Sequence, residues 1–243
     1  MRAAVARVLT ALGVRVKIPS LPTNPTMPDV VTALREVGEE LPPGDGFRHF
    51  NAMYLLVTEG VAELIEHGGA KDAEYLIHLD AMFCQLYFDA LSAGADNAPR
   101  AWQPMLDRRH RKGISGMRFA IAGMNAHINR DLSVALDAAC RRVGGELFDD
   151  DDRHHDFQTV DVLLGRLMAR TKDIVQDPLE ELLDDSMGTL DDAVEHWSIR
   201  HARGVAWENG QHLCRLRDEP AAHSRFLRGV DRTAGLIGRL LLL

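Results

Sequence analysis

MRFAIAGMNAHINRDLSVALDAAC, residues 117–140, is the stretch that decides the fold. Its apolar residues lie on almost every side of a helical projection, as is typical of a helix buried at the centre of a protein. Gly144 and Gly145 follow it, and glycine commonly ends a helix. We therefore predict one long central helix over about residues 115–142, against which the rest of the chain packs.

Apolar residues also recur every three to four positions on both sides of this stretch, and this spacing predicts further helices. They cover about residues 28–40, 46–67, 72–92, 156–175, 189–217 and 221–240, most of them ending near a glycine or proline, whereas the basic residues 100–113 are expected to be irregular. No segment alternates apolar and polar residues as a strand does. The predicted fold class is all-α, a single-domain bundle of about seven helices with a long central helix.

Length and composition fit one globular domain behind an N-terminal extension. The chain has 243 residues, of which 46% are hydrophobic and 26% charged, and this is enough to bury a sizeable core. Residues 1–28 are basic and contain four prolines, so we expect an extension there and the helical domain over residues 29–243. Apolar positions near residues 5–12 also fit a short amphipathic helix.

Charge and cysteine content bear on partners and location. A net charge of -8 should repel nucleic acid and anionic membranes. No run reaches the roughly 20 apolar residues that span a bilayer. Three cysteines without metal-ligand spacing favour a reducing compartment. We expect a cytoplasmic protein that binds a small molecule and no nucleic acid, with residues 240–243 packed on the domain itself or on a second subunit of a homodimer.

Polar residues within the central helix define the candidate site. His127 and Asp131 are four residues apart and share a helical face, as do Asn125 and Asn129. Because a buried carboxylate or imidazole needs partners, three readings stay open: a structural hydrogen-bond network, a ligand pocket without metal, or a divalent metal held by His127, Asp131 and Asp80. Asp80 could meet His127 across a pair of helices. No cofactor other than such a metal is expected.

Four further residues are candidates for binding a substrate. Asn51 and Tyr54 lie in the helix at 46–67, and His155 and Trp207 lie in later helices. The acidic run 149–152 is expected in a solvated loop, with Asp156 as the N-cap of the following helix, and an Asp-rich magnesium motif is the alternative.

Seven segments together carry a family resemblance. They are FNAMYLLVTEGV (50–61), LDAMFCQLYFDAL (79–91), PRAWQPML (99–106), FAIAGMNAHINRDL (119–132), HHDFQTVDVLL (154–164), ARGVAWENGQHL (202–213) and VDRTAGLIGRLLL (230–242). Their order, and the motif AGMNAHINRDL above all, resembles an uncharacterised and mainly actinobacterial family of helical proteins, catalogued as a domain of unknown function, over roughly residues 30–243. The resemblance implies a helical domain in a bacterial cytoplasm and no established reaction. Its recurring segments include Asp80, Asn125, His127, Asn129, Asp131 and Asp156.

The function predicted from these residues is that of a small-molecule enzyme of bacterial specialised metabolism. His127 would act as general acid or base, oriented by Asp131 or Asp80, while Asn125 and Asn129 would hydrogen-bond a carbonyl or a developing oxyanion. Cyclisation, isomerisation and hydrolysis all fit, so the class is a lyase or isomerase (a cyclase) or a hydrolase. The alternatives are a ligand-binding or structural helical protein without catalysis, and a metal-dependent hydrolase or isoprenoid-type lyase.

Overall fold

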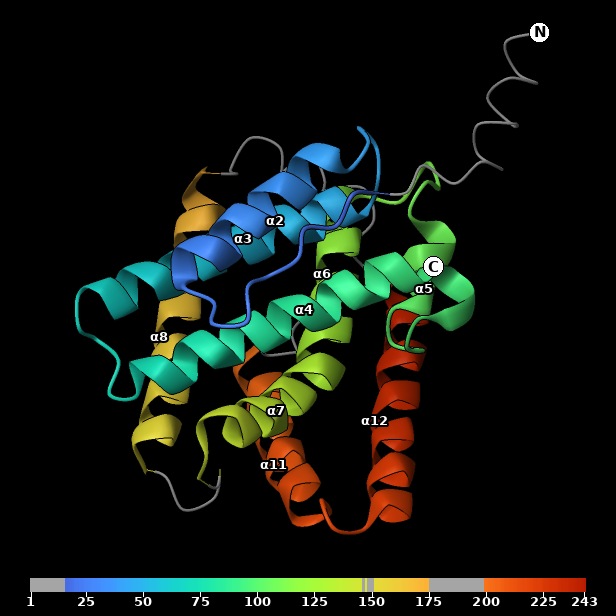
Figure 1. Cartoon of the computed structure of the whole chain (residues 1–243). Coiled ribbons are helices and arrows are strands. Elements are labelled where there is room, and N and C mark those ends of the chain that lie inside the picture. Colours follow the sequence, from blue (N-terminus) through green and yellow to red (C-terminus); the bar gives the residue numbers. More distant parts are fainter. Residues whose placement is uncertain (1–15, 146, 148–150, 175–198) are drawn as a thin grey trace, which may run out of the picture.

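A computed structural model describes residues 16–145, 147, 151–174 and 199–243, and every regular element in these ranges is helical (Figure 1). The elements outside the central helix are α2 (Met27–Glu40), α3 (Phe47–Glu66), α4 (Ala73–Asn97), α5 (Gln103–Arg108), α8 (Asp151–Ile174), α11 (Ile199–Arg215) and α12 (Pro220–Leu241). The predicted all-α fold class is confirmed. The amphipathic stretch near residues 5–12, the first half of the acidic run and the start of the helix predicted at 189–217 lie outside the described ranges.

The central helix runs without interruption from Gly116 to Val143 and has three parts. These are α6 (Gly116–Ala126), η1 (His127–Leu132) and α7 (Ser133–Val143). Ser115 starts the helix by accepting a hydrogen bond from the backbone N–H of Arg118, and Gly144 ends it with a φ of 85°. The middle part, η1, is a π-helix, in which the backbone bonds run from i to i+5. The length of this helix was predicted from the sequence, but its wide turn was not.

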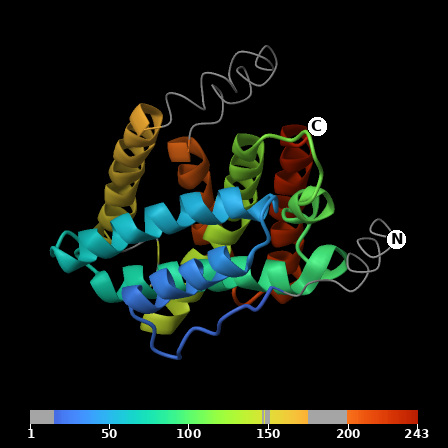
Figure 2. The same ribbon diagram turned by 90° about the horizontal axis from the view of Figure 1, so that it is seen from above.

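The other helices enclose this central helix (Figures 1 and 2). α4 and α11 pack against α7, α3 packs against α6, and α12 packs against both α6 and η1. α8 and α12 lie on opposite sides of the central helix in both views. Four large aromatic side chains fill the space between α3, α4 and the chain before α5, and they contact one another ring to ring: Phe47, Phe50, Tyr87 and Trp102.

Two local expectations were wrong. The segment 100–113, expected to be irregular, contains the helix α5, which has proline in its first turn where a missing N–H costs nothing. α8 begins at Asp151, so Asp156 lies inside this helix and does not cap it. The buried Asp156 carboxylate instead accepts from the backbone N–H groups of Lys71 and Asp72, at 2.8–3.0 Å, and so caps the start of α4.

Both ends of the described chain are tied to the bundle. Residues 16–26 contact the core through Val16, Ile18 and Leu21, and Arg142 donates to the carbonyl oxygen of Thr23 at 3.1 Å. At the other end Leu241 and Leu242 are buried against the domain itself, whereas Leu240 and Leu243 are exposed. Among the described helices, none is both long and apolar enough to cross a membrane.

Candidate functional site

An apolar cavity lies beside η1, where α3, α4, α8 and the start of α11 meet the central helix. Its volume is about 90 Å³. Most of its wall is aliphatic or aromatic, and the polar or charged side chains that line it belong to Tyr54, Asp80, His127 and Arg203. A concave apolar site with a few convergent polar groups is the usual form of a small-molecule site.

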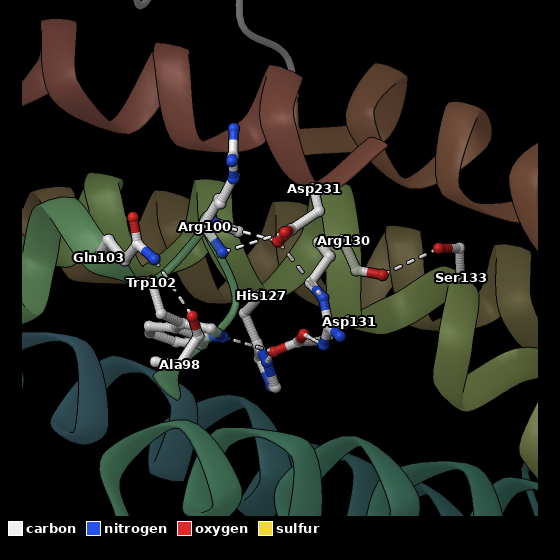
Figure 3. Close-up of polar contacts among 10 residues, drawn as sticks. Ala98, Arg100, Trp102, Gln103, His127, Arg130, Asp131, Ser133 and Asp231 are labelled. Carbon is white, nitrogen blue, oxygen red and sulfur yellow. Dashed lines mark hydrogen bonds and ion pairs between the residues drawn. The ribbon is translucent and has the colours of Figure 1, made fainter. Parts of the chain in front are cut away.

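The Asp131 carboxylate orients His127 in this wall. Asp131 is fully buried, and its Oδ2 lies 3.1 Å from Nδ1 of His127 and 2.8 Å from Nε1 of Trp102, which donates to it (Figure 3). Its Oδ1 accepts from Arg130. Both carboxylate oxygens are thus held by donors on two different segments, the start of α5 and the π-helix.

The arrangement fixes the protonation state of His127. Burial lowers the pKa of the imidazole, although the hydrogen bond and charge of Asp131 oppose this effect. The ring is therefore neutral near pH 7, and since a carboxylate only accepts hydrogen bonds, the proton is on Nδ1. Nε2 then carries a lone pair, and within the described residues this buried atom has no hydrogen-bond partner.

Aromatic rings hold the imidazole in place on the cavity side. Phe83 stacks on it with a centroid distance of 3.4 Å and an interplanar angle of 5°. Phe50 and Tyr54 contact it edge-on at 5.4 and 4.7 Å. Because these contacts come from α3 and α4 while Asp131 holds the opposite edge, the ring has little freedom to turn.

Asp80 places a second titratable group in the same cavity. Burial raises the pKa of its carboxyl to about 7, and the charge of Arg203 and the hydroxyl of Tyr54 oppose this rise. Arg203 is itself paired with Asp161 and donates to the carbonyl oxygen of Phe157 at 3.1 Å. The Tyr54 hydroxyl is near enough to the Asp80 carboxyl to lower its pKa, but neither this hydroxyl nor Oδ2 of Asp80 makes a hydrogen bond of full geometry among the described residues. The expected hydrogen bond between Asp80 and His127 is absent there, and the carboxylate that orients the imidazole is that of Asp131.

Asn125 and Asn129 do not face the cavity. The Asn125 amide donates to the backbone oxygen of Ala234 in α12 at 2.9 Å and accepts from Asn129 at 2.9 Å. Their expected role at a carbonyl or oxyanion is therefore not supported, because the pair joins the central helix to α12 on the other side from the cavity.

Three more of the expected substrate-binding residues lie away from the cavity. Asn51 is buried, donates to the carbonyl oxygen of Leu34 at 3.0 Å and accepts from Tyr87 at 3.2 Å, which joins α2, α3 and α4. Trp207 is a core residue stacked on His154, with centroids 4.9 Å apart. His155 is exposed on α8. Of the six expected substrate-binding residues, only Tyr54 lines the cavity.

The three residues suggested as metal ligands do not converge. Among the described residues no group of three or more His, Cys, Asp or Glu side chains could hold a metal ion. Asp131 already accepts from His127, Trp102 and Arg130, and the positive charge of Arg130 beside it opposes a bound cation. This donor set does not fit a metal centre.

Three residues of the site were not foreseen from the sequence. Trp102 and Arg130 hold Asp131, and Arg203 lies in the cavity wall. A signal existed for Arg130, because a charge next to Asp131 in an otherwise apolar helix requires a partner. Trp102 carried a weaker one, since it lies in the recurring segment PRAWQPML.

Comparisons with known proteins identify a family and no activity. A family model described as "Family of unknown function (DUF5995)" matches residues 27–243. No curated protein and no solved structure matches the chain. The expected resemblance to a domain of unknown function is confirmed over nearly the whole described chain.

Proposed function

We propose a function from the site itself, since the chain belongs to DUF5995, a family whose description names no activity. The protein is a small-molecule enzyme that moves protons on an apolar ligand held in the cavity between α3, α4, α8 and η1. One observation carries this proposal: Nε2 of His127 has a lone pair, is oriented through Asp131, and has no partner among the described residues of an apolar cavity.

His127 is the general base of this proposal. Its Nε2 accepts a proton from a C–H or O–H group of the ligand, and the resulting imidazolium is stabilised by the Asp131 carboxylate 3.1 Å from Nδ1. An orienting carboxylate of this kind fixes the tautomer and the direction of the ring. General acid–base catalysis of this sort contributes about 10²–10⁴-fold to a rate.

Asp80 is the general acid. With a pKa of about 7, a large fraction of its carboxyl groups is protonated near neutral pH, so it can give a proton to the ligand while His127 removes another. Tyr54 replaces the two asparagines as the donor to a carbonyl oxygen, because its buried hydroxyl lies in the cavity wall near Asp80 and makes no hydrogen bond of full geometry among the described residues. Two groups with opposite proton-transfer roles in one cavity fit an isomerisation or a cyclisation.

The apolar wall favours these reactions over hydrolysis. A hydrolase must hold a water molecule at the reacting atom, and water needs two to four polar partners to be ordered. The cavity is mostly lined by aliphatic and aromatic side chains, so it is better suited to exclude water. A cavity of about 90 Å³ admits a compact ligand, such as a small cyclic ketone or alkene.

The proposed setting is a bacterial cytoplasm, in specialised metabolism and with AGMNAHINxDL as the family's motif in actinobacteria. The three cysteines, all buried and free of disulfides, support the reducing compartment, and the net charge of -8 supports the absence of nucleic-acid binding. Binding of a small molecule and not of nucleic acid belongs to the same proposal. A homodimer would use the exposed Leu240 and Leu243 at the end of α12.

The test measures proton removal directly. The purified protein is incubated in D₂O with small cyclic ketones, and deuterium uptake next to the carbonyl is followed by NMR. We expect faster uptake than in buffer for at least one ketone, with a loss of about 100-fold or more in His127→Asn. This variant keeps a side-chain N–H for Asp131 and lacks the Nε2 base.

His155→Gln is the matched control, because His155 is an exposed histidine outside the cavity, and its rate should equal that of the wild type. The proposal fails if the wild type does not exceed buffer with any ketone, or if His127→Asn is folded and retains the rate. The alternative, a structural or ligand-binding protein, predicts that His127→Asn changes stability alone.

A further inference from the structure

A second, polar hollow lies on the other side of Arg130 from the cavity. It is an open groove of about 470 Å³ between the end of α4, the start of α5 and the first half of α12. Its lining includes Asn97, Arg100, Arg130, His223, Ser224 and Arg228. Nothing in the proposed catalytic arrangement uses these residues except Arg130.

The groove presents more positive than negative charge. Arg100, Arg130 and Arg228 line it against the single carboxylate of Asp231. Asp231 is already engaged, since it accepts from the backbone N–H groups of Arg100 and Ala101 at 3.0 Å and lies 3.6 Å from Nε of Arg130 (Figure 3). The Arg100 and Arg228 guanidinium groups have no ion pair among the described residues.

Two buried nitrogen atoms of the groove also lack hydrogen-bond partners in the described part of the chain. They are Nε2 of His223 and Nε of Arg130, whose side chain is 14% exposed. Nε of Arg130 is a fixed N–H donor with only the distant Asp231 oxygen near it, and Nε2 of His223 is a donor in the tautomer protonated there, so both can bond to an acceptor from outside the chain. The hydroxyl of Ser224 and the amide of Asn97 add neutral donors to the same lining.

We propose that this groove binds the phosphate group of a small anionic ligand through Arg100, Arg228 and His223. Arginine matches phosphate because its planar guanidinium donates two parallel hydrogen bonds to two oxygens. A multiply charged group is favoured over a single carboxylate, because Arg100 and Arg228 both lack an ion pair among the described residues, while Arg130 already pairs with Asp131 and Asp231. The site is separate from the catalytic cavity and does not depend on the proposed reaction.

The experiment measures binding of pyrophosphate to the full chain by isothermal titration calorimetry. We expect the dissociation constant to rise at least tenfold in Arg228→Ala and in Arg100→Ala. Arg239→Ala is the matched control, since it removes the same charge from an exposed position of the same helix outside the groove. Its dissociation constant should stay within about twofold of the wild type.

Vesicles of phosphatidylcholine containing phosphatidic acid distinguish a lipid headgroup from a soluble phosphate. Binding to vesicles alone, lost in Arg228→Ala and kept in Arg239→Ala, assigns the phosphate group to a lipid. Binding to pyrophosphate that is lost in Arg228→Ala and kept in Arg239→Ala assigns the phosphate group to a soluble ligand. The proposal is overturned if neither form binds, or if Arg239→Ala weakens binding as much as Arg228→Ala does, because the effect is then one of overall charge.

Discussion

At the scale of single residues, Asp131 connects three side chains and is the main acceptor or counter-charge for each of them within the buried part of the site. Its oxygens accept from Trp102, Arg130 and His127, and Trp102 and His127 are almost completely buried. Removing one partner of a buried ion pair destabilises the protein by far more than the net strength of the pair. The partners that remain are still buried away from water, and they have lost the group that compensated for this.

Asp131→Asn should therefore destabilise the protein by about 3–5 kcal/mol. The amide replaces one acceptor oxygen by a donor that faces donors already present, and Arg130 keeps only the more distant Asp231 as a counter-charge. Urea unfolding followed by circular dichroism gives the change in the free energy of unfolding. The exposed Asp107→Asn serves as control and should stay within about 0.5 kcal/mol of the wild type; an equally small effect at Asp131 would contradict the network.

Asp80 should make the protein less stable as the pH rises from about 4 to about 7. Its pKa is raised to about 7 in the folded state, so between the unfolded value near 4 and the folded value the native state binds one proton more than the unfolded state. Stability is full below the unfolded pKa and is lost as the pH rises, by roughly 4 kcal/mol in all. Urea unfolding gives the free energy of unfolding of the wild type and of Asp80→Asn across this pH range. The difference between the two proteins should change by this amount.

The groups that face Asp80 are present in both the wild type and Asp80→Asn, so their own contributions to the pH dependence of stability cancel in this comparison. They are Tyr54 from α3, His127 from η1, and Arg203 from α11 with its partner Asp161 from α8. His127 acts in the opposite sense, since its lowered pKa removes stability as the pH falls. Asp89→Asn, an exposed change in the same helix as Asp80, should keep the full pH dependence of the wild type. If the difference in the free energy of unfolding between the wild type and Asp80→Asn is the same at every pH, Asp80 does not titrate in this range.

At the scale of elements, the π-helix η1 behaves as an α-helix into which one extra residue has been inserted. Deletion of Asn129 should therefore convert this turn to α-helix and leave α6 and α7 in their places, so that the variant folds. Deletion of the exposed Leu56 in α3, which contains no such turn, rotates all later residues of that helix by about 100° and should abolish cooperative unfolding. Thermal unfolding by circular dichroism compares the two; an unfolded Asn129 deletion would contradict this reading.

The position of α12 depends on a glycine. A Cβ atom on Gly235 would lie 2.5 Å from the carbonyl oxygen of Arg100, and a backbone atom cannot turn away as a side chain can. Gly235→Ala should cost about 1–3 kcal/mol. Gly229→Ala, in the same helix with no atom within 4 Å of the added methyl, should stabilise by about 0.5–1 kcal/mol. Urea unfolding should show that the two substitutions change the free energy of unfolding in opposite directions. A change in the same direction for both would contradict the position of α12 against Arg100.

The sequence predicted elements better than it predicted contacts between them. Apolar spacing and the glycine and proline stops located most helices to within a few residues. The His127–Asp131 pair also followed from spacing along one helix. Spacing along a helix does not say which neighbour covers each face, so nothing in the sequence placed Asn125 against α12 or Asn51 between three helices. The π-helix left no signal either, because its residues fit an ordinary helical pattern.

At the scale of the whole molecule, charge is distributed unevenly over the surface. The chain has a net charge of -8, yet α12 has Arg225, Arg228, Arg232 and Arg239 and a single carboxylate, that of Asp231. The proposed catalytic cavity lies on the side of α8, and the proposed phosphate groove lies beside α12 on the opposite side of the central helix. Arg130 lines the groove and pairs with Asp131, the residue that orients His127 in the cavity wall.

The apolar cavity also determines how the protein responds to hydrostatic pressure. Space that no atom fills in the folded state is lost on unfolding, so the unfolded protein and its water occupy the smaller volume and compression favours it. A compact apolar guest such as xenon would occupy the cavity and raise the pressure at which half of the molecules unfold. A compression experiment monitored by tryptophan fluorescence can thus rank candidate guests by how well they fill the cavity, before any reaction is known.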